Sequence, residues 1–349
     1  MSPDVVPGTA RSELLPVRDP VTTGRRLEVD VSIVSGLNQA LTVQCLESLL
    51  GTAGDDRFDL RVTVTCNTPG STLASRLRKQ YPGVRVLENQ SVKGFAANHN
   101  VVLRASTADY VLVLNDDLIF RPGAVAAAIE FLERPENQGV GTLTPRLLNP
   151  DGTLQPCTFS FPTVTRVLLA VSGIRDRIPT TPRLYWLARL LRRSNGRSRF
   201  WEHDRVCDVE TFAGAAMFVR GRALRDVGVL DETTQVGGEE TEWHRRFWER
   251  GWRVVFYPGA EVVHLGSQTV GRDPSLDNEF FKGALNYFRL HGSAGAYLGL
   301  LVSSAALFGF RRALAVVRGD RERAGRAAVG WRTALAWLRA GRSHAGTRV

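Results

Sequence analysis

The stretch Tyr110-Val-Leu-Val-Leu114, followed directly by Asn115-Asp116-Asp117, decides the fold class. An uninterrupted apolar run ahead of a polar turn is typical of a buried strand. Carboxylates at the carboxyl end of such a strand line the crevice in which open α/β sheets bind ligands. A divalent cation that bridges phosphate groups would relieve the repulsion between the two aspartates. The same tripeptide also suits a solvated turn, because Asn and Asp are turn formers.

Strand-like and helix-like patterns alternate around this stretch. They predict strands at 29–35, 60–65, 84–87 and 110–114, and helices at 41–50, 71–81, 96–105 and 122–132. This alternation predicts an α/β fold with a mostly parallel, doubly wound sheet of nucleotide-binding architecture. No G-x-G-x-x-G follows the first strand and no G-K-[ST] occurs, so a dinucleotide fold and a P-loop ATPase are not supported.

The second half of the chain is less regular. A buried segment is predicted at 212–220, a helix at 239–250, and short strands at 253–257 and 261–264. The stretch 294–310 holds 17 uncharged residues, with three glycines and two serines among them. We interpret it as too short and too weakly apolar to cross a membrane.

Composition limits the class of protein. With 349 residues and 43% hydrophobic content, the chain can bury a sizeable core, as one large or two ordinary domains. Its four cysteines are far apart and predict neither a disulfide framework nor a zinc site. Residues 1–28 form a polar, proline-containing leader without an apolar signal region, so we expect a cytoplasmic catalytic part.

The basic charge is concentrated at the C-terminus. Residues 311–349 contain ten arginines and two acidic residues, which leaves +8 of the formal net charge of +10. Three apolar residues there follow helical spacing, and three arginines fall on another side; these are Trp331, Leu335 and Leu338, and Arg332, Arg339 and Arg342. This composition favours a helix on an anionic membrane surface. The alternative is a helical pair packed onto the catalytic domain. No recognised nucleic-acid-binding module accompanies the tail, so we expect no nucleic-acid partner.

Nine short motifs then follow one another in an order known from one enzyme family. They are Val31-Ser-Ile-Val34 with Cys45-Leu-Glu-Ser-Leu-Leu50; Gly94-Phe-Ala-Ala-Asn98-His-Asn100; Leu114-Asn-Asp-Asp117; Asp151-Gly-Thr-Leu-Gln155; Gly214-Ala-Ala-Met-Phe-Val-Arg220; Gly228-Val-Leu-Asp231; Gly238-Glu-Glu-Thr-Glu242; Gly251-Trp-Arg-Val-Val255; and Val263-His-Leu-Gly266. Over residues 29–290 the chain resembles inverting family-2 glycosyltransferases of the GT-A fold, especially rhamnosyltransferase-like members. The resemblance implies a leader at 1–28, a GT-A domain at 29–290 and a basic amphipathic helical tail at 291–349.

The resemblance also implies a donor site. Asp117 takes the position that holds Mg²⁺ or Mn²⁺ on the donor diphosphate, and His264 the position that completes the metal shell. A satisfied core histidine is the alternative for His264. The donor-binding positions are Ser35, Asn67, Gly94, Phe95, Asn98, Asn115 and Asp116. Cys66 stands where relatives carry an aspartate that binds the pyrimidine ring, and a thiol is a poor acceptor for that bond.

A glutamate pair matches the family's catalytic segment. Glu240 takes the position of the general base that deprotonates the acceptor hydroxyl, with Glu239 as the alternative. Both carboxylates could instead complement the dipole at a helix N-terminus. The acceptor is expected to contact Gly214, Glu242 and Trp243, although Glu242 could instead support the helix.

The resemblance thus implies an inverting glycosyltransferase that moves a sugar such as rhamnose from a nucleotide-diphosphate donor to a glycan or polyprenyl-linked acceptor. We expect it on the inner face of the plasma membrane, in the synthesis of cell-envelope polysaccharide. A sugar nucleotidyltransferase is disfavoured, because Ser35-Gly-Leu-Asn38 after the first strand lacks a basic residue. A non-catalytic scaffold that binds nucleotide sugars or membranes is the third alternative.

Overall fold

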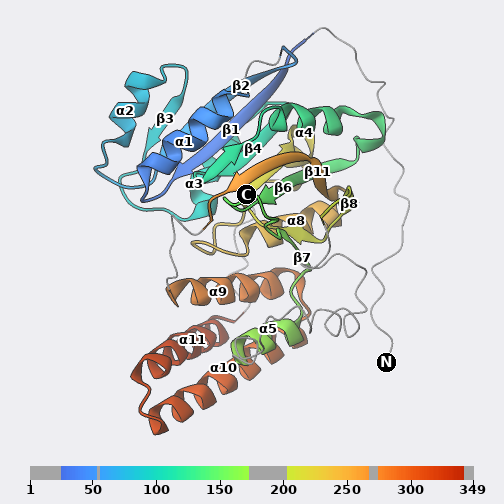
Figure 1. Ribbon diagram of the computed structural model, residues 1–349. Helices are drawn as coiled ribbons and strands as arrows, with labels where there is room; N and C mark the ends of the chain where they lie inside the picture. Colours follow the sequence, from blue (N-terminus) through green and yellow to red (C-terminus); the bar gives the residue numbers. More distant parts are fainter. Residues whose placement is uncertain (1–24, 53–55, 173–202, 267–273, 342–349) are drawn as a thin grey trace.

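An α/β domain lies on a layer of helices in this protein (Figure 1). The computed structural model describes residues 25–52, 56–172, 203–266 and 274–341. Most of the predicted leader, and Arg342 of the tail, lie outside the described residues.

The α/β domain is built on one mixed sheet. Its strand order is β3-β2-β1-β4-β10-β6-β11-β5, with β8 paired to β11. The strands are β1 (Leu27–Ser35), β2 (Phe58–Cys66), β3 (Arg85–Glu88), β4 (Tyr110–Asn115), β5 (Leu118–Phe120), β6 (Val140–Leu148), β8 (Cys207–Asp208), β10 (Ala216–Arg220) and β11 (Arg253–His264). β1 to β4, β6 and β11 run in one direction, whereas β5, β8 and β10 run in the other. A small second sheet pairs β7 (Thr158–Phe159) with β9 (Thr211–Phe212). The predicted mostly parallel α/β sheet is confirmed.

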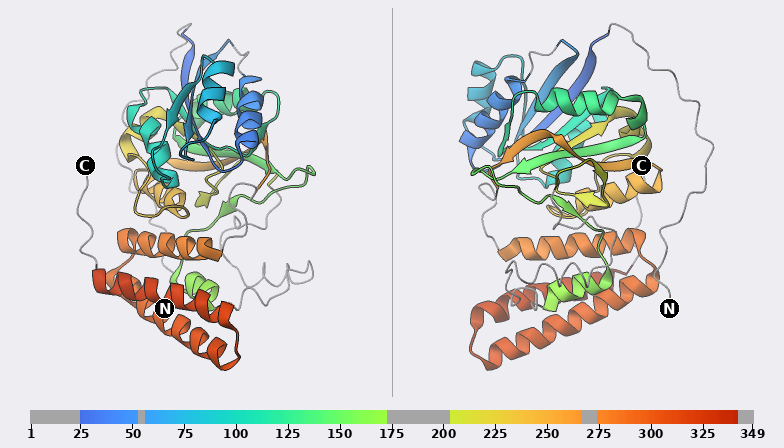
Figure 2. Two further views of the ribbon diagram at one scale, coloured as in Figure 1. Left: turned by 90° about the vertical axis from the view of Figure 1, so that its left-hand side faces the viewer. Right: turned by 45° about the vertical axis from the view of Figure 1, so that its right-hand side comes forward.

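Helices cover both faces of this sheet. α1 and α3 lie on opposite faces (Figure 2). The helices of this domain are α1 (Gln39–Leu50), α2 (Leu73–Gln80), α3 (Phe95–Ala105), α4 (Ala124–Glu133), the short η1 (Pro135–Asn137), α7 (Gly221–Val227) and α8 (Glu239–Glu249). β4 lies at the centre of the sheet, and its residues 111–114 are 0% exposed, as its continuous apolar run predicts.

Two predicted element boundaries differ from the structure. The two short strands expected at 253–257 and 261–264 form the single strand β11, whose register shifts between Tyr257 and Glu261. Pro258 lies in this interruption, and proline cannot donate a ladder hydrogen bond. α4 begins at Ala124 rather than Pro122, because Gly123 takes a left-handed conformation with φ of 77°.

The second layer is entirely helical in its described part. It consists of α5 (Val164–Ser172), α9 (Pro274–His291), α10 (Ala294–Val317) and α11 (Arg321–Ala340). Apolar side chains from these helices form a second core, including Leu285, Tyr297, Leu300 and Ala334. α9 therefore packs with the helices, although the sequence-based division placed it in the α/β domain. The division at residue 290 stays a prediction.

α10 is longer than its uncharged stretch suggested. It continues past Phe310, through Arg311 and Arg312, to Val317. In length and composition it meets the requirement for a membrane-crossing helix, and only 22% of its most apolar stretch is buried within the protein. It is the one such helix among the described residues.

Candidate active site

Asp117 and His264 meet at one edge of the sheet. Asp117 lies in the turn between β4 and β5, and His264 ends β11 opposite Leu118 of β5. The backbone N–H of Leu265 donates to the Asp117 carbonyl oxygen at 2.9 Å, which ties the two segments together. His264 Nε2 lies 3.2 Å from Asp117 Oδ1. This oxygen is buried, and no other donor within the described ranges reaches it. The predicted metal-binding pair is thus brought together.

The two groups suit a hard divalent cation. A carboxylate oxygen and an imidazole nitrogen are both ligands for Mn²⁺, and the carboxylate suits Mg²⁺. The unbonded Asp117 Oδ1 and the nearby His264 Nε2 provide these donor atoms. Within the described residues, no cluster of three or more His, Cys, Asp or Glu side chains could hold a metal alone. The remaining ligands would therefore come from the donor diphosphate and water.

Asp116 is fixed by the turn after β1. Its Oδ2 accepts hydrogen bonds from the Gly36 backbone N–H at 2.7 Å and from Thr42 Oγ1 at 2.9 Å. Ser35 Oγ lies 3.0 Å from the same threonine hydroxyl. Asp116 and Ser35 are both buried beside this turn. Hydrogen bonds thus stabilise one of the two neighbouring carboxylates. Asn115 is half-buried, and its N–H donates to the Ala215 carbonyl oxygen at 2.9 Å.

An asparagine cluster orders the loop before α3. Asn89 Nδ2 donates to Asn67 Oδ1 at 2.8 Å and to Asn98 Oδ1 at 2.6 Å. Asn67 and Asn98 also donate to the Lys93 carbonyl oxygen. The predicted donor-binding residues Asn67 and Asn98 therefore share one network, whose central member, Asn89, the sequence did not indicate. Burial raises the pKa of the neighbouring Cys66 to about 11, so it stays a thiol at neutral pH.

Gly94 allows contact between two protein segments. A Cβ at this position would lie 2.6 Å from the Gln235 carbonyl oxygen, closer than any side chain permits. The Phe95 N–H donates to the same oxygen at 2.8 Å. The start of α3 thus holds the loop that leads into α8.

The glutamate pair begins α8 at this loop. Gly237 and Gly238 both have φ of 93°, a conformation that favours glycine. Glu240 Oε2 accepts a hydrogen bond from the Gly238 N–H at 3.1 Å. A Cβ at Gly214 would lie 3.5 Å from Glu240 Cβ and 3.7 Å from Phe95 Cζ. The structure therefore brings Gly214, Phe95 and Glu240 together.

Burial makes both glutamates weaker acids. Burial, together with a smaller effect of the charge of Glu240, raises the pKa of Glu239 to about 8. Glu239 is 5% exposed, and its Oε2 has no hydrogen-bond partner among the described residues. Burial also raises the pKa of Glu240, which backbone N–H groups partly offset. A carboxylate with a raised pKa is a better general base near neutral pH.

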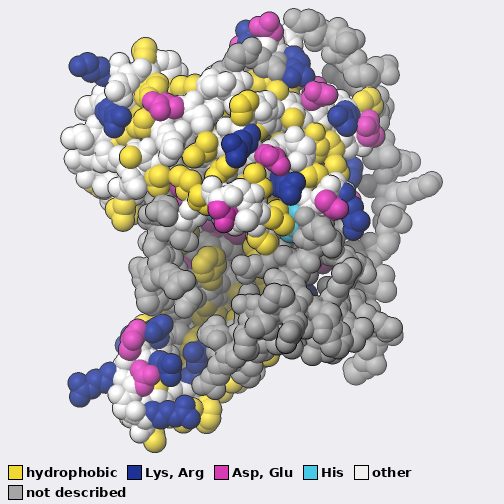
Figure 3. Space-filling view, in the orientation of Figure 1, with side chains coloured by type: hydrophobic (Ala, Val, Ile, Leu, Met, Phe, Trp, Pro, Cys, Tyr) yellow, Lys and Arg dark blue, Asp and Glu magenta, His cyan; other side chains and the backbone are white. Residues whose placement is uncertain are grey.

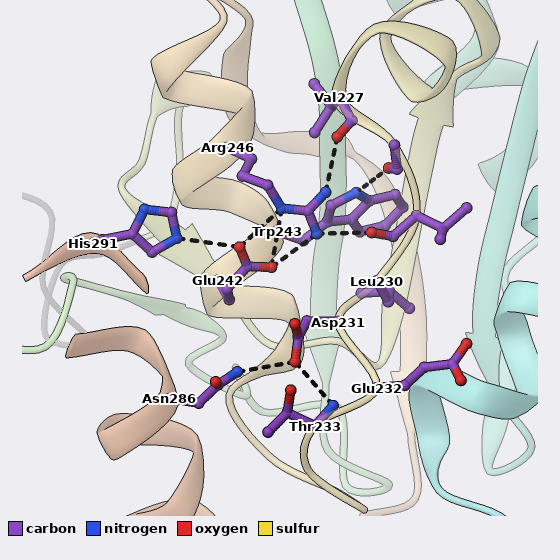
Figure 4. Close-up of polar contacts among 12 residues, drawn as sticks. Val227, Leu230, Asp231, Glu232, Thr233, Glu242, Trp243, Arg246, Asn286 and His291 are labelled. Carbon is purple, nitrogen blue, oxygen red and sulfur yellow. Dashed lines mark hydrogen bonds and ion pairs between the residues drawn. The ribbon is translucent and has the colours of Figure 1, made fainter. Parts of the chain in front are cut away.

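α9 clamps the segment that carries these glutamates (Figure 4). Asn286 donates to Asp231 Oδ1 at 2.9 Å. His291 Nε2 lies 3.1 Å from Glu242 Oε1, and Arg246 forms an ion pair with the same carboxylate at 2.8 Å. Burial raises the pKa of Glu242, but hydrogen bonds from His291 and Arg246 outweigh that effect and lower it. Glu242 therefore joins α8 to α9.

Two side chains that were predicted to contact the acceptor are buried between elements of the protein. Glu242 is buried in its ion pairs, as described above. Trp243 is 0% exposed, and its Nε1–H donates to the Gly228 carbonyl oxygen at 2.7 Å (Figure 4). Neither side chain offers a surface to an acceptor. Gly214, which is half-buried beside Glu240, is the predicted acceptor position that does face the catalytic segment.

Comparisons with known proteins give relatives of this chain. Two curated relatives, from Mycobacterium tuberculosis strains CDC 1551 / Oshkosh and ATCC 25618 / H37Rv, are described as N-acetylglucosaminyl-diphospho-decaprenol L-rhamnosyltransferase. Each is 28% identical over 209 residues, which cover 56% of this chain and 64% of the relative.

A solved structure supports the fold alone. The crystal structure of GalNAc-T7 with UDP, GalNAc and Mn²⁺ matches 74% of this chain and 47% of that chain, with a TM-score of 0.51 and 14% identity.

The family model described as glycosyltransferase like family 2 matches residues 29–278, which includes both the aspartate turn and the glutamate pair. The chain belongs to this glycosyltransferase family.

Proposed function

We propose that the protein is an inverting, metal-dependent glycosyltransferase. The observation that carries the proposal is that the Asp117–His264 pair and Glu240 lie along one continuous edge. The Asn115 N–H bonds to the Ala215 carbonyl oxygen, and the adjacent Gly214 packs against Glu240. Two contacts therefore connect the segment with the candidate metal-binding pair to the candidate base, and a single displacement at a sugar carbon requires both groups at one site.

Each group has a separate chemical task. Asp117 and His264 would hold a divalent cation, which neutralises charge on the departing nucleoside diphosphate when bound. Glu240 takes the proton from the acceptor hydroxyl as that oxygen attacks the anomeric carbon from the face opposite the leaving group. The bond to the diphosphate breaks as the new glycosidic bond forms, so configuration inverts. Glu239 is the alternative base.

The relatives suggest the substrates. Because they are described as transferring L-rhamnose to a decaprenol-linked diphosphate sugar, we propose rhamnose as the transferred sugar and a polyprenyl-linked acceptor. The match spans 64% of each relative, so the transferred sugar and the acceptor are proposals that go beyond the family assignment. Such a reaction would serve the synthesis of cell-envelope polysaccharide.

We also propose peripheral docking on the inner face of the plasma membrane, but through α10 rather than the predicted face of α11. Trp331 is half-buried against α10, beneath Arg312 at 5.6 Å, so that face is used for packing. α10 instead exposes Leu298 by 56%, Val302 by 53% and Phe310 by 66%, at one side of the helix. Basic side chains, with some acidic ones among them, gather at the end of the molecule where α10 meets α11 (Figure 3). An apolar face bordered by cations suits an anionic bilayer.

Donor binding and turnover test the proposal together. Nucleoside diphosphates should bind more tightly with Mn²⁺ than without it, and Asp117→Ala should remove that difference. The wild type should then transfer sugar from a nucleotide-sugar panel to a polyprenyl-diphosphate glycan, with inversion seen by NMR. Retention of configuration, or equal metal-dependent turnover of Asp117→Ala, would contradict the mechanism.

A further inference from the structure

Gln155 contacts the ring of His264 on the side away from Asp117. It lies in the turn after β6, within the motif Asp151-Gly-Thr-Leu-Gln155. Gln155 Oε1 is 2.6 Å from His264 Nδ1. Gln155 Nε2 is 3.1 Å from Asn149 Oδ1 and 3.5 Å from the His264 carbonyl oxygen. The side chain therefore bridges the turn to the end of β11.

The hydrogen-bond partners fix the orientation of each polar group in this turn. Asn149 Nδ2 faces the Leu154 carbonyl oxygen at 3.4 Å and Thr153 Oγ1 at 2.9 Å, so its Oδ1 must face Gln155. The Thr153 hydroxyl donates to Asp151 Oδ1 at 2.6 Å, and these hydrogen bonds lower the pKa of Asp151. One chain of side-chain hydrogen bonds thus runs from His264 through Gln155, Asn149 and Thr153 to the Asp151 carboxylate.

This direction determines the tautomer of the imidazole. Since Gln155 Nε2 lies between two acceptors, its Oε1 must face the ring and accept from it. His264 Nδ1 therefore carries a hydrogen, and in the neutral ring Nε2 presents its lone pair toward Asp117 Oδ1. Two electron-rich atoms 3.2 Å apart are an arrangement that a cation between or beside them would stabilise.

We propose that Gln155, oriented through Asn149, Thr153 and Asp151, is the positioning residue that fixes His264 with Nε2 available to a divalent cation. This inference rests on the metal dependence in the proposed function. In this proposal Gln155 acts through His264 and is not itself a ligand of the cation. A purely structural role, in which the amide only anchors the turn to β11, makes different predictions.

Mn²⁺ binding separates the two roles. Gln155→Leu keeps the approximate size but cannot accept from Nδ1, so the Mn²⁺ affinity, followed by electron paramagnetic resonance with UDP present, should fall about 10- to 100-fold. The imidazole nitrogen coupling to Mn²⁺ in pulsed spectra should weaken or disappear. Gln155→Glu keeps an acceptor for Nδ1 and should retain this coupling. Gln80→Leu, a matched change at an exposed position of α2, should alter neither signal.

A double-mutant cycle gives the decisive comparison. In a His264→Ala background, Gln155→Leu should cause no further loss of Mn²⁺ affinity, because the residue it positions is already absent. An equal loss in both backgrounds, or unchanged nitrogen coupling in a Gln155→Leu protein that melts like the wild type, would overturn the proposal. If the wild type shows no nitrogen coupling and Asp117→Ala binds Mn²⁺ equally well, the metal dependence itself fails, a result distinguishable from failure of Gln155 alone.

Discussion

Gly283 of α9 lies against Gly237, so closely that a Cβ on Gly283 would sit 2.1 Å from the Gly237 carbonyl oxygen. This contact joins the helical layer to the loop that starts α8. Glu240 follows three residues after Gly237, and its carboxylate is bonded to the Gly238 N–H. The position of the candidate base therefore depends on a helix outside the sheet.

Gly283→Ala should displace this loop and lower kcat, because a misplaced base loses its approach to the acceptor hydroxyl. We expect a reduction of about 10- to 100-fold with little change in donor affinity. Gly295→Ala, on α10 where a Cβ meets nothing within 4 Å, is the matched control and should leave kcat unchanged. Steady-state kinetics and calorimetric donor binding measure both. A Gly283→Ala enzyme with wild-type kcat would show that the contact does not position the base.

Glu240→Gln should preserve donor affinity and reduce kcat by about 10²- to 10⁴-fold, because the amide cannot accept the acceptor proton. Glu239→Gln should cost less, since its carboxyl is buried and does not contact Gly214. Turnover of both variants under saturating donor and acceptor tests the assignment. The reverse order of effects would identify Glu239 as the base.

The raised pKa of Glu239 predicts a pH dependence of stability. Between the unfolded value near 4.5 and the folded value of about 8, the folded chain binds a proton that the unfolded chain has released. The free energy of unfolding should therefore fall as pH rises through this window. Glu239→Gln removes the titrating group and should flatten that slope. Urea unfolding at pH 5, 6.5 and 8 compares the two proteins, and equal slopes would contradict the shift.

Trp243→Phe should reduce stability and leave acceptor recognition intact. The change removes the bond from Nε1 to Gly228 and part of a fully buried side chain. We expect a loss of about 1–3 kcal/mol in the free energy of unfolding. Acceptor KM should stay within about twofold. A large rise in KM in a protein of unchanged stability would restore the predicted acceptor contact.

Val302→Asp with Phe310→Asp should abolish pelleting with anionic vesicles, because both charges enter the exposed face of α10. Leu37→Asp with Val92→Asp makes the same chemical change at sites 79% and 67% exposed on the α/β domain, and should pellet like the wild type. Sedimentation with vesicles of anionic and neutral lipid measures binding. Equal pelleting of both double variants would rule out α10 as the docking face.

The sequence predicted the strands and helices that are indicated by a local pattern of apolar residues. The apolar run of β4 and the aspartates after it correctly indicated a buried strand that ends at a candidate ligand-binding edge. The strand and helix bounds of the first half differ from the structure by about two residues, as frayed ends and caps allow. His264 was placed at the end of the last strand, where it meets Asp117.

The remaining features depend on tertiary contacts that periodicity does not encode. Helical spacing put Glu242 and Trp243 beside the catalytic pair, but α9 and Gly228 determine that both are buried. The motif ending at Gln155 was visible in the sequence, yet its role required the ring of His264, 109 residues away. On the amphipathic face of α11, Trp331 lies against Arg312 of α10, whereas Leu338 is 37% exposed, because an apolar stripe cannot specify whether protein or lipid covers it.

The reversed direction of β10 brings the start of one strand and the ends of others to the same edge of the sheet. Because β10 runs antiparallel to β4, the start of β10 lies at the same edge of the sheet as the end of β4. The turns with the predicted donor-binding residues Ser35 and Asp116 follow strands. The segment that brings Gly214 to Glu240 instead precedes a strand, β10. Insertions upstream of Gly214 would therefore reshape the acceptor side without shifting the strand register that holds Asp117. Such insertions would change which acceptor the enzyme glycosylates and leave the binding of the nucleotide-sugar donor unchanged.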